Sequence, residues 1–337
     1  MKELIEKATK IVILTHKAPD GDAMGSSLAL WHYIKGFDQT ERQATVIVPN
    51  AFPAFFNWMP GADSVKVYEQ APDACNAIMA EADLFICTDF CSPQRIDPVG
   101  AKMLENPAPK IVIDHHLTRE HDCYAVAYID PSASSACEIV YRLIANANAN
   151  ANALTADIAT CLYTGLMTDT GNFSYSSSRP EVFEMAAALL RAGIDKDGIH
   201  QAVFDQFSID RIRLTGFALY RKMRIYPENH VALITLSADE LDQFHYQPGD
   251  CEGLVNMPLQ IADVYYSILM REDRPKPGTK RSRIRISFRS LGDRSVSVYA
   301  SRIFHGGGHK NASGADMFGT IEQAVATFEK TYKTYLK

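Results

Sequence analysis

The chain of 337 residues is long enough for two domains of about 150 residues each, and its 47% hydrophobic content is ordinary for a protein with sizeable cores. A formal net charge of −6 excludes a surface that is basic overall. No apolar run reaches the roughly 18 residues of a membrane span, and the first ten residues are too charged for a signal peptide. We therefore expect a cytoplasmic protein with no membrane partner, whose seven scattered cysteines are reduced thiols.

The stretch over residues 11–25 contains the first candidate site. Its apolar start predicts a buried strand, and residues 23–34 are apolar at helical spacing. Between them lie His16, Asp20 and Asp22, on a predicted loop that turns at the glycine between the two aspartates. Residues two apart cannot share a helix face, but on a loop they can converge as ligands of a hard metal ion. The alternative is that one aspartate only caps the helix.

Further short β-branched runs alternate with helical patterns along the first half of the chain. They cover residues 45–48, 64–68, 84–87, 111–113 and 125–129. This alternation predicts an α/β fold, a parallel Rossmann-like sheet with helices on both faces. Ligands of such sheets bind beyond the carboxyl ends of the strands. Two of the runs lead into Asp89 and into the triplet Asp114, His115 and His116, so we expect these residues to join the candidate site.

Helices are predicted next. Ser135 and Glu138 have the spacing of a capping box at the start of a helix that runs through residue 144. Residues 145–153 alternate Ala and Asn and are interpreted as a helix end or connector. A helix over 155–168 delivers Asp169, and a further helix covers 180–192.

We place a first domain, which holds the candidate site, over residues 1–194, a helical connector over 195–225 and a smaller mixed-sheet α/β domain over 226–337. The second domain opens with candidate strands at 231–236 and 265–270. Residues 271–294 then hold nine Lys/Arg and three Asp/Glu. In that segment apolar and polar residues alternate, which predicts a half-buried strand with a basic face. The apolar side is Ile284, Ile286 and Phe288, and the other side is Arg283, Arg285, Ser287 and Arg289. Val296 and Val298 predict a continuing strand.

A glycine-rich segment follows this basic strand. Gly306, Gly307 and Gly308 expose backbone N–H groups to which a phosphate can come close, and His309 adds a side-chain donor. Such a segment on its own is equally typical of a flexible loop. Beside a basic strand we interpret it as an anion cradle.

The candidate ligands predict two divalent cations. They are His16, Asp20, Asp22, Asp89, His115 and Asp169. Four carboxylates together would repel one another and take up protons, whereas two divalent ions cancel their charge. Oxygen-rich ligands with two imidazoles suit Mn²⁺ better than Ca²⁺ or a thiolate-bound Zn²⁺, and two such ions suit attack of hydroxide on phosphorus.

These motifs together resemble the DHH phosphoesterase family with its associated C-terminal domain, and most of all its oligoribonuclease and 3′-phosphoadenosine 5′-phosphate (PAP) phosphatase group. The resemblance rests on the order of His16, Asp20, Asp22 and Asp89, the Asp114-His115-His116 triplet, Asp169, the Arg289-Ser290 pair and the glycine segment through Gly314. It implies a catalytic domain and a substrate-binding domain with the active site in the cleft between them. It also implies two Mn²⁺ ions, with Mg²⁺ or Co²⁺ as substitutes.

The resemblance also assigns roles. His16 and Asp20 would hold one ion, and Asp22, His115 and Asp169 the other, with Asp89 bridging both. His116 would contact the scissile phosphate and protonate the leaving oxygen, and Asp114 would orient its neighbours. Substrate would be bound by Arg289, Ser290, Gly306, Gly307, Gly308, His309 and, more weakly, Asn256. His305 departs from the family pattern, where a further glycine is common.

The expected substrates are short RNA oligonucleotides, cleaved to mononucleotides, and PAP, cleaved to AMP. Only one basic strand is visible and no groove studded with aromatic residues continues from it, so efficiency should fall as the RNA lengthens. A phosphodiesterase of cyclic or linear dinucleotides and, in another class, an inactive module that binds nucleotides or RNA ends are the alternatives. Cleavage polarity and a homodimer stay open.

Overall fold

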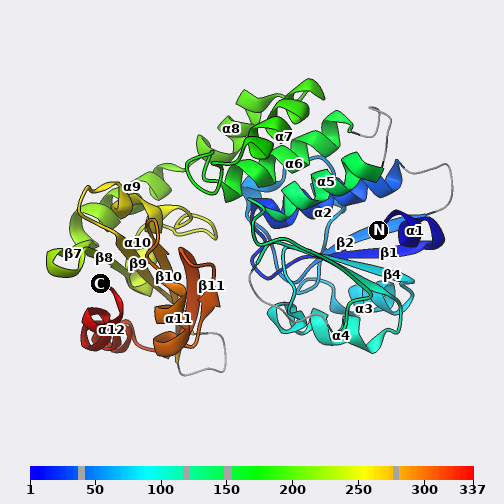
Figure 1. The fold of residues 1–337 in the computed structure, drawn as a ribbon. Coiled ribbons are helices and arrows are strands. Elements are labelled where there is room, and N and C mark those ends of the chain that lie inside the picture. The colour runs from blue at the N-terminus through cyan, green and yellow to red at the C-terminus, as the bar shows by residue number, and fades with distance from the viewer. Residues whose placement is uncertain (37–41, 117–121, 148–153, 276–280) are drawn as a thin grey trace. The chain divides into compact units, whose positions relative to one another are not determined.

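The computed structural model describes residues 1–36, 42–116, 122–147, 154–275 and 281–337. The chain divides into two compact units, Met1–Gln206 and Phe207–Lys337 (Figure 1). The predicted connector over 195–225 contributes helices to both: α8 (Lys196–Phe204), α9 (Ile209–Phe217) and the π-helix η5 (Ala218–Lys222). Of the predicted connector at 145–153, residues 148–153 lie outside the described residues. None of the helices formed by the described residues combines the length and the apolar character needed to cross a membrane.

The first unit is built on a six-stranded sheet in which all neighbours are parallel, as the sequence predicts. The order is β3-β2-β1-β4-β5-β6, with β1 at Lys10–Leu14, β2 at Gln43–Val48, β3 at Lys66–Val67, β4 at Leu84–Thr88, β5 at Lys110–Asp114 and β6 at Val126–Ile129. The predicted strand over 64–68 is shortened to two residues, because Ala62–Ser64 form a 3₁₀ turn. From β1 the sheet grows toward β2 on one side and toward β4 on the other, so a switch point lies between β1 and β4.

Helices cover both faces of this sheet, as the residues of β1 illustrate (Figure 1). Ile11 and Ile13 pack into a core with α2 (Gly21–Lys35), α5 (Ala136–Ala147), α6 (Ala156–Asp169) and α7 (Pro180–Arg191). Val12 and Leu14 pack into the opposite core with α3 (Pro72–Ala80) and α4 (Val99–Glu105). Successive residues of a strand point to opposite faces, so a strand covered on both sides is apolar throughout. The short helix α1 (Lys2–Lys7) precedes β1.

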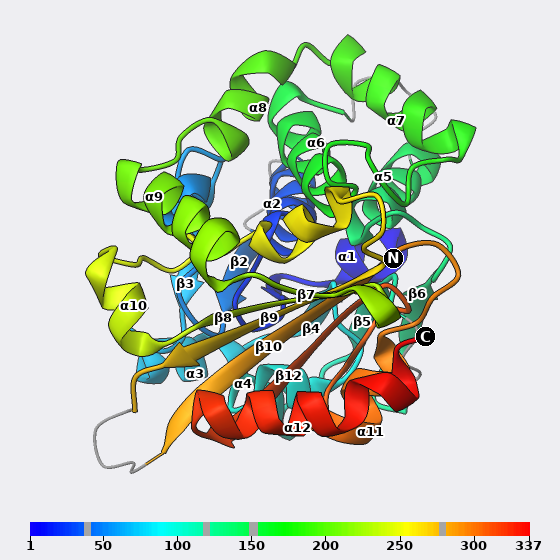
Figure 2. The same ribbon diagram turned by 90° about the vertical axis from the view of Figure 1, so that its left-hand side faces the viewer.

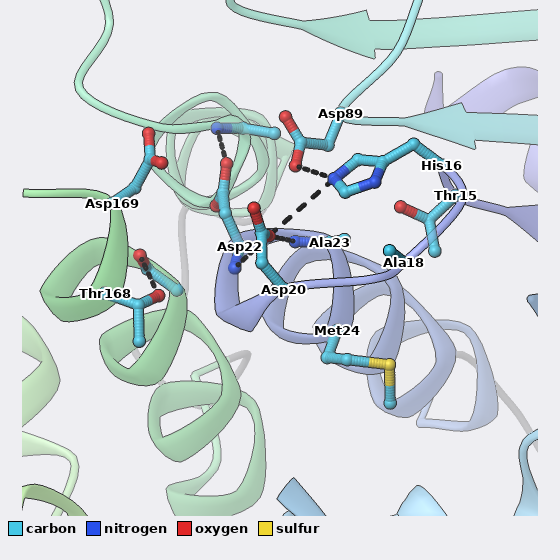
Figure 3. Close-up of polar contacts among 12 residues, drawn as sticks. Thr15, His16, Ala18, Asp20, Asp22, Ala23, Met24, Asp89, Thr168 and Asp169 are labelled. Carbon is cyan, nitrogen blue, oxygen red and sulfur yellow. Dashed lines mark hydrogen bonds and ion pairs between the residues drawn. The ribbon is translucent and has the colours of Figure 1, made fainter. Parts of the chain in front are cut away.

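Glycines allow α2 and α6 to lie in close contact. A Cβ at Gly25 would come within 2.5 Å of the carbonyl oxygen of Cys161, and one at Gly21 within 2.2 Å of Thr168 Oγ1. Any larger residue would push the two helices apart. The contact brings the end of α6, which carries Asp169, to the first turn of α2, which carries Asp22 (Figure 3).

The second unit contains a mixed six-stranded sheet, which confirms the predicted fold class of this half. The order is β11-β12-β10-β9-β8-β7, with β7 at Arg224–Tyr226, β8 at Val231–Leu236, β9 at Tyr266–Asp273, β10 at Ser282–Ser290, β11 at Gly307–Gly308 and β12 at Ala312–Gly319. Only β8 and β9 pair in parallel; the other described pairs are antiparallel.

The two faces of this sheet are covered differently. Ile284, Ile286 and Phe288 of β10 are buried beneath α11 (Ser297–Phe304) and α12 (Ile321–Tyr335), which run together along one face in Figure 2. On the other face, α9, α10 (Ala238–Gln243) and the 3₁₀ helix η7 (Leu254–Gln260) pack over residues of β8 and β9. The remaining 3₁₀ segments are η1 (Ala54–Phe56), η3 (Pro93–Ile96) and η6 (Pro227–Asn229).

The predicted strand at Val296 and Val298 is wrong, because this segment begins helix α11. Val296 is fully buried while Val298 is 46% exposed. Residues two apart in a strand would point to the same face and be buried alike. Burial recurs at Tyr299, Ala300 and Phe304, which is the spacing of a helix side.

Candidate metal centre

The opening loop is shorter than predicted, because α2 begins at Gly21 and Asp22 lies in its first turn. Asp20 is the N-cap residue, and its Oδ1 accepts hydrogen bonds from the amides of Asp22 and Ala23, both at 3.1 Å. The two aspartates still converge, since one precedes the helix and the other follows directly within it. Capping and membership of the site, which the sequence offers as alternatives, therefore occur together at Asp20.

The other candidate residues arrive from three further elements. Asp89 follows β4 with a left-handed backbone (φ +64°), a conformation that is strained for a residue with a side chain and is found at functional sites. Asp114 is the last residue of β5, and His115 and His116 follow it. Asp169 is the last residue of α6. β1, β4 and β5 are adjacent, so their carboxyl ends bring these side chains together.

One group of side chains is centred on His16. Its Nε2 lies 3.2 Å from Asp89 Oδ2 and 3.8 Å from Asp20 Oδ1 (Figure 3). The other ring nitrogen, Nδ1, is 2.8 Å from the carbonyl oxygen of Lys17, so it is the nitrogen that donates there. This contact directs Nε2 toward the carboxylates, as is typical of histidines that bind metal ions.

A second group is centred on His115. Its Nε2 lies 3.4 Å from Asp89 Oδ1, 3.5 Å from Asp169 Oδ2 and 3.8 Å from Asp22 Oδ2. Asp89 therefore belongs to both groups, with one carboxylate oxygen facing each. All six predicted ligands are brought together in this way, within the first unit.

Asp22 is held by backbone groups that the sequence analysis did not identify. The amide of Ala136 donates to its Oδ2 at 2.6 Å and the amide of Cys137 to its Oδ1 at 2.9 Å. Both amides belong to the first turn of α5, where the helix dipole favours a negative charge.

The start of α5 is fixed in turn by buried polar contacts. Ser135 Oγ accepts from the amide of Glu138, as the predicted capping box requires, but Glu138 Oε2 accepts from the amide of Ser134 instead of Ser135. The carboxylate of Glu138 is 2% exposed and pairs with Arg179 at 2.5 Å. The capping-box spacing of Ser135 and Glu138 was the only feature of the sequence that indicated these contacts at the start of α5.

His116 contacts Asp114 through both its ring and its backbone. Its Nδ1 donates to Asp114 Oδ1 at 2.6 Å, and its backbone amide donates to the same oxygen at 3.2 Å. The side chain of Asp114 is fully buried. Although burial alone would raise it, the bond from His116 lowers the pKa of Asp114 below its ordinary value. Asp114 therefore stays ionised and fixes the orientation of the His116 ring.

Four of the carboxylates and imidazoles of the site have pKa values above their ordinary ones. Burial, with the charge of Asp89, raises the pKa of Asp22 to about 7, and burial raises that of Asp169 as well. Burial lowers the pKa of His16 and His115, but the surrounding carboxylates outweigh it and hold both well above 6.5. Cations bound there would replace these protons. The donor set of carboxylate oxygens and imidazole nitrogens fits hard or borderline divalent ions.

These shifts predict how the metal-free protein responds to pH. Groups whose pKa is raised on folding stabilise the fold at low pH and lose that contribution as pH rises through the folded pKa. Asp22, Asp169, His16 and His115 all have raised values, so unfolding temperature in chelator should fall between pH 6 and pH 8.5. Added Mn²⁺ should raise the unfolding temperature more at pH 8.5, where fewer protons compete for the ligands.

Calorimetry at both pH values measures these unfolding temperatures. A metal-free protein whose unfolding temperature rises with pH contradicts it, and Asp22→Asn should weaken the dependence.

The predicted substrate residues lie in the second unit, gathered around one end of its sheet. Arg289 is half-buried near the end of β10 and stands opposite Ala312 of β12. Gly308 pairs with Ser313, the next residue of β12, and His309 follows it. Asn256 lies in η7, which contacts β10. Ser290 is buried, and its hydroxyl donates to the carbonyl oxygen of Arg294 at 2.8 Å.

Two of the three glycines in the glycine segment are required because nearby backbone atoms leave no room for a side chain. A Cβ at Gly306 would lie 2.1 Å from the Gly314 carbonyl oxygen, and one at Gly308 would lie 2.5 Å from that of Ala312. A Cβ at Gly307 would meet nothing within 4 Å among the described residues. His305 ends α11 in the left-handed conformation (φ +54°), which explains why glycine suits this position.

Comparisons with known proteins agree with this architecture. The DHH family, N-terminal domain, matches residues 10–166. The bifunctional oligoribonuclease and PAP phosphatase NrnA of Bacillus subtilis is 25% identical over 93% of this chain and 90% of its own length. A probable protein of the same name from Streptococcus mutans is 29% identical over 93% and 91%. A crystal structure of an exopolyphosphatase-related protein from Bacteroides fragilis is 40% identical, covers 99% of this chain and 94% of its own, and has a TM-score of 0.90.

The parallel sheet gathers carboxylates and imidazoles beyond its strand ends, an arrangement suited to metal ions in an α/β enzyme. The chain belongs to the DHH family of phosphoesterases. It is therefore an enzyme that hydrolyses phosphoester bonds.

Proposed function

We propose that the enzyme uses two Mn²⁺ ions to hydrolyse short oligoribonucleotides to mononucleotides and PAP to AMP. The observation that carries this proposal is the position of Asp89, whose two oxygens face two separate groups of candidate ligands. A carboxylate shared in this way is what a two-metal site requires. The names of the Bacillus subtilis and Streptococcus mutans relatives support the choice of substrates.

In this proposal His16 and Asp20 would hold one ion, Asp22, His115 and Asp169 would hold the other, and Asp89 would serve both. Two ions bound there would supply an activated water and neutralise charge on the phosphate. His116, oriented by Asp114, gives a proton to the leaving oxygen. The amides at the start of α5 keep Asp22 in place while substrate comes and goes.

The second unit binds the rest of the substrate. Arg289 and His309 hold the terminal phosphate, and Gly307, the sterically open glycine, offers its backbone N–H. Ser290, Gly306, Gly308 and Asn256 complete this binding region. Within this region Ser290 shapes the end of β10, because its hydroxyl donates to the carbonyl oxygen of Arg294.

A panel of substrates with Mn²⁺ tests the proposal. It contains 5′-phosphorylated di- to tetranucleotide RNA, PAP, linear and cyclic dinucleotides, pyrophosphate and a short polyphosphate. We expect the highest kcat/KM for the short RNA, turnover of PAP in the same pocket, and loss of both with chelator. Preference for a cyclic dinucleotide favours the phosphodiesterase alternative, and binding of RNA without turnover favours the inactive module.

Arg289→Ala is expected to act mainly on KM. The guanidinium would contact a phosphate that does not react, so it binds the ground state and the transition state alike. One charge-assisted contact is worth about 1.5–3 kcal/mol, so KM should rise by about tenfold or more for both dinucleotide RNA and PAP, with kcat little changed. Steady-state kinetics measure this. An unchanged KM for both substrates would show that the Arg289 face of β10 is an ordinary solvated surface.

A further inference from the structure

The exposed half of the basic sheet face extends well beyond Arg289. Along β10, Ser287, Arg285 and Arg283 follow Arg289 at two-residue intervals on the same side. Each interval is about 7 Å, which is comparable with the distance between consecutive phosphates of an extended nucleotide chain. Arg285 and Arg283 therefore lie about 14 and 20 Å along the strand from Arg289.

The middle of this strip has small residues on β10 and β12. Ser287 stands opposite Gly314 of β12, and among the described residues the nearest atom to a Cβ at Gly314 would be 3.7 Å away. The side chain of Phe318, on the same face and opposite Arg283, is 64% exposed. A sugar–phosphate chain could lie on this floor with a base against the phenyl ring.

The strip carries positive charge that its own carboxylates do not neutralise. Arg283 pairs with Asp316 at 2.5 Å, and Arg271 of β9 pairs with Asp273 at 3.0 Å. Arg285 stands between them, opposite both Arg271 and Asp316, and within the part of the chain that the structure describes its guanidinium has no hydrogen bond or ion pair. An exposed guanidinium in this position is suited to bind an anion.

We propose that Arg285 and Arg283 bind the third and fourth phosphates of an oligoribonucleotide whose terminal phosphate is held at Arg289. This rests on the proposed function, in which the second phosphate is the one that reacts. The two intervals of β10 from Arg289 to Arg285 then correspond to the two steps from the first phosphate of the substrate to the third. PAP and a dinucleotide have only two phosphates, so they never reach Arg285. The strip would extend recognition to four nucleotides, which refines the expectation that efficiency simply falls with length.

The experiment compares kcat/KM for PAP and for 5′-phosphorylated di-, tri- and tetranucleotides. Arg285→Ala should lower the value for the tri- and tetranucleotide by about tenfold, the effect of one modest charge-assisted contact, and leave PAP and the dinucleotide within about twofold. Arg283→Ala should affect only the tetranucleotide. Arg285→Lys should retain part of the effect, and Arg302→Ala, which removes an exposed arginine from α11 on the opposite side of the sheet, should change none.

Salt dependence supplies a second readout that a structural defect would not imitate. In the unaltered enzyme, log KM for the trinucleotide should rise with log salt more steeply than for the dinucleotide, by about 0.7 for one extra phosphate contact. Arg285→Ala should remove that difference. Equal losses on all substrates, or an unchanged trinucleotide, overturn this inference alone. Failure of the unaltered enzyme to hydrolyse any of these substrates instead overturns the proposed function, and this inference with it.

Discussion

Asp89→Asn is expected to reduce turnover by about 10³-fold or more and to lower the content of bound Mn²⁺. The substitution removes the negative charge that lies 3.2 Å from His16 Nε2 and 3.4 Å from His115 Nε2, so it weakens both ligand groups at once. Loss of charge stabilisation worth several kcal/mol gives a rate effect of this size. Asparagine keeps the side-chain shape and tolerates the left-handed backbone at this position, so the fold should persist.

The measurements are metal content by elemental analysis and kcat/KM on a dinucleotide. Asp157→Asn is the matched control, because it removes one carboxylate from an exposed position in the first turn of α6 without touching the site. It should retain two ions and normal turnover. Normal metal content and rate in Asp89→Asn would show that the two ligand groups do not share this residue.

Much of the candidate site could be predicted from sequence because it follows the strands. Each of β1, β4 and β5 is a short apolar run, and in a parallel sheet the residues after such runs meet at one edge. His16, Asp89 and His115 could therefore be placed near one another before the strand order was known. Asp169 instead follows a helix, so its place in the site depends on how closely α6 packs on α2 through Gly21 and Gly25.

The features that could not be predicted from the sequence depend on contacts between residues that are far apart in the chain. The amides of Ala136 and Cys137 bind Asp22 across more than a hundred positions, and backbone donors carry no residue signature. The helix α11 was mistaken for a strand because Val296 and Val298 are β-branched and two apart. Its real pattern extends to Phe304 and appears only when the burial of the whole segment is known.

His116→Ala is expected to keep both metal ions and to lower kcat on RNA by roughly 10²–10⁴-fold, the usual effect of losing a general acid. The reason lies in its contact with Asp114, which holds the ring through Nδ1, while in the proposed role Nε2 would exchange a proton with substrate. Asp114→Asn should cause a smaller loss of the same kind, and the double variant should lose less than the sum, because both residues act on one proton.

The leaving group separates this role from metal binding. A p-nitrophenyl ester of a nucleoside 5′-phosphate releases a stable anion that needs no proton, whereas a ribose oxygen needs one. His116→Ala should therefore hydrolyse the ester within about tenfold of the unaltered enzyme while remaining slow on RNA. His200→Ala, which alters a half-exposed histidine of α8, should be normal on both. Equal losses on ester and RNA, or loss of one ion, would instead assign His116 to metal binding, because a missing metal slows every substrate alike.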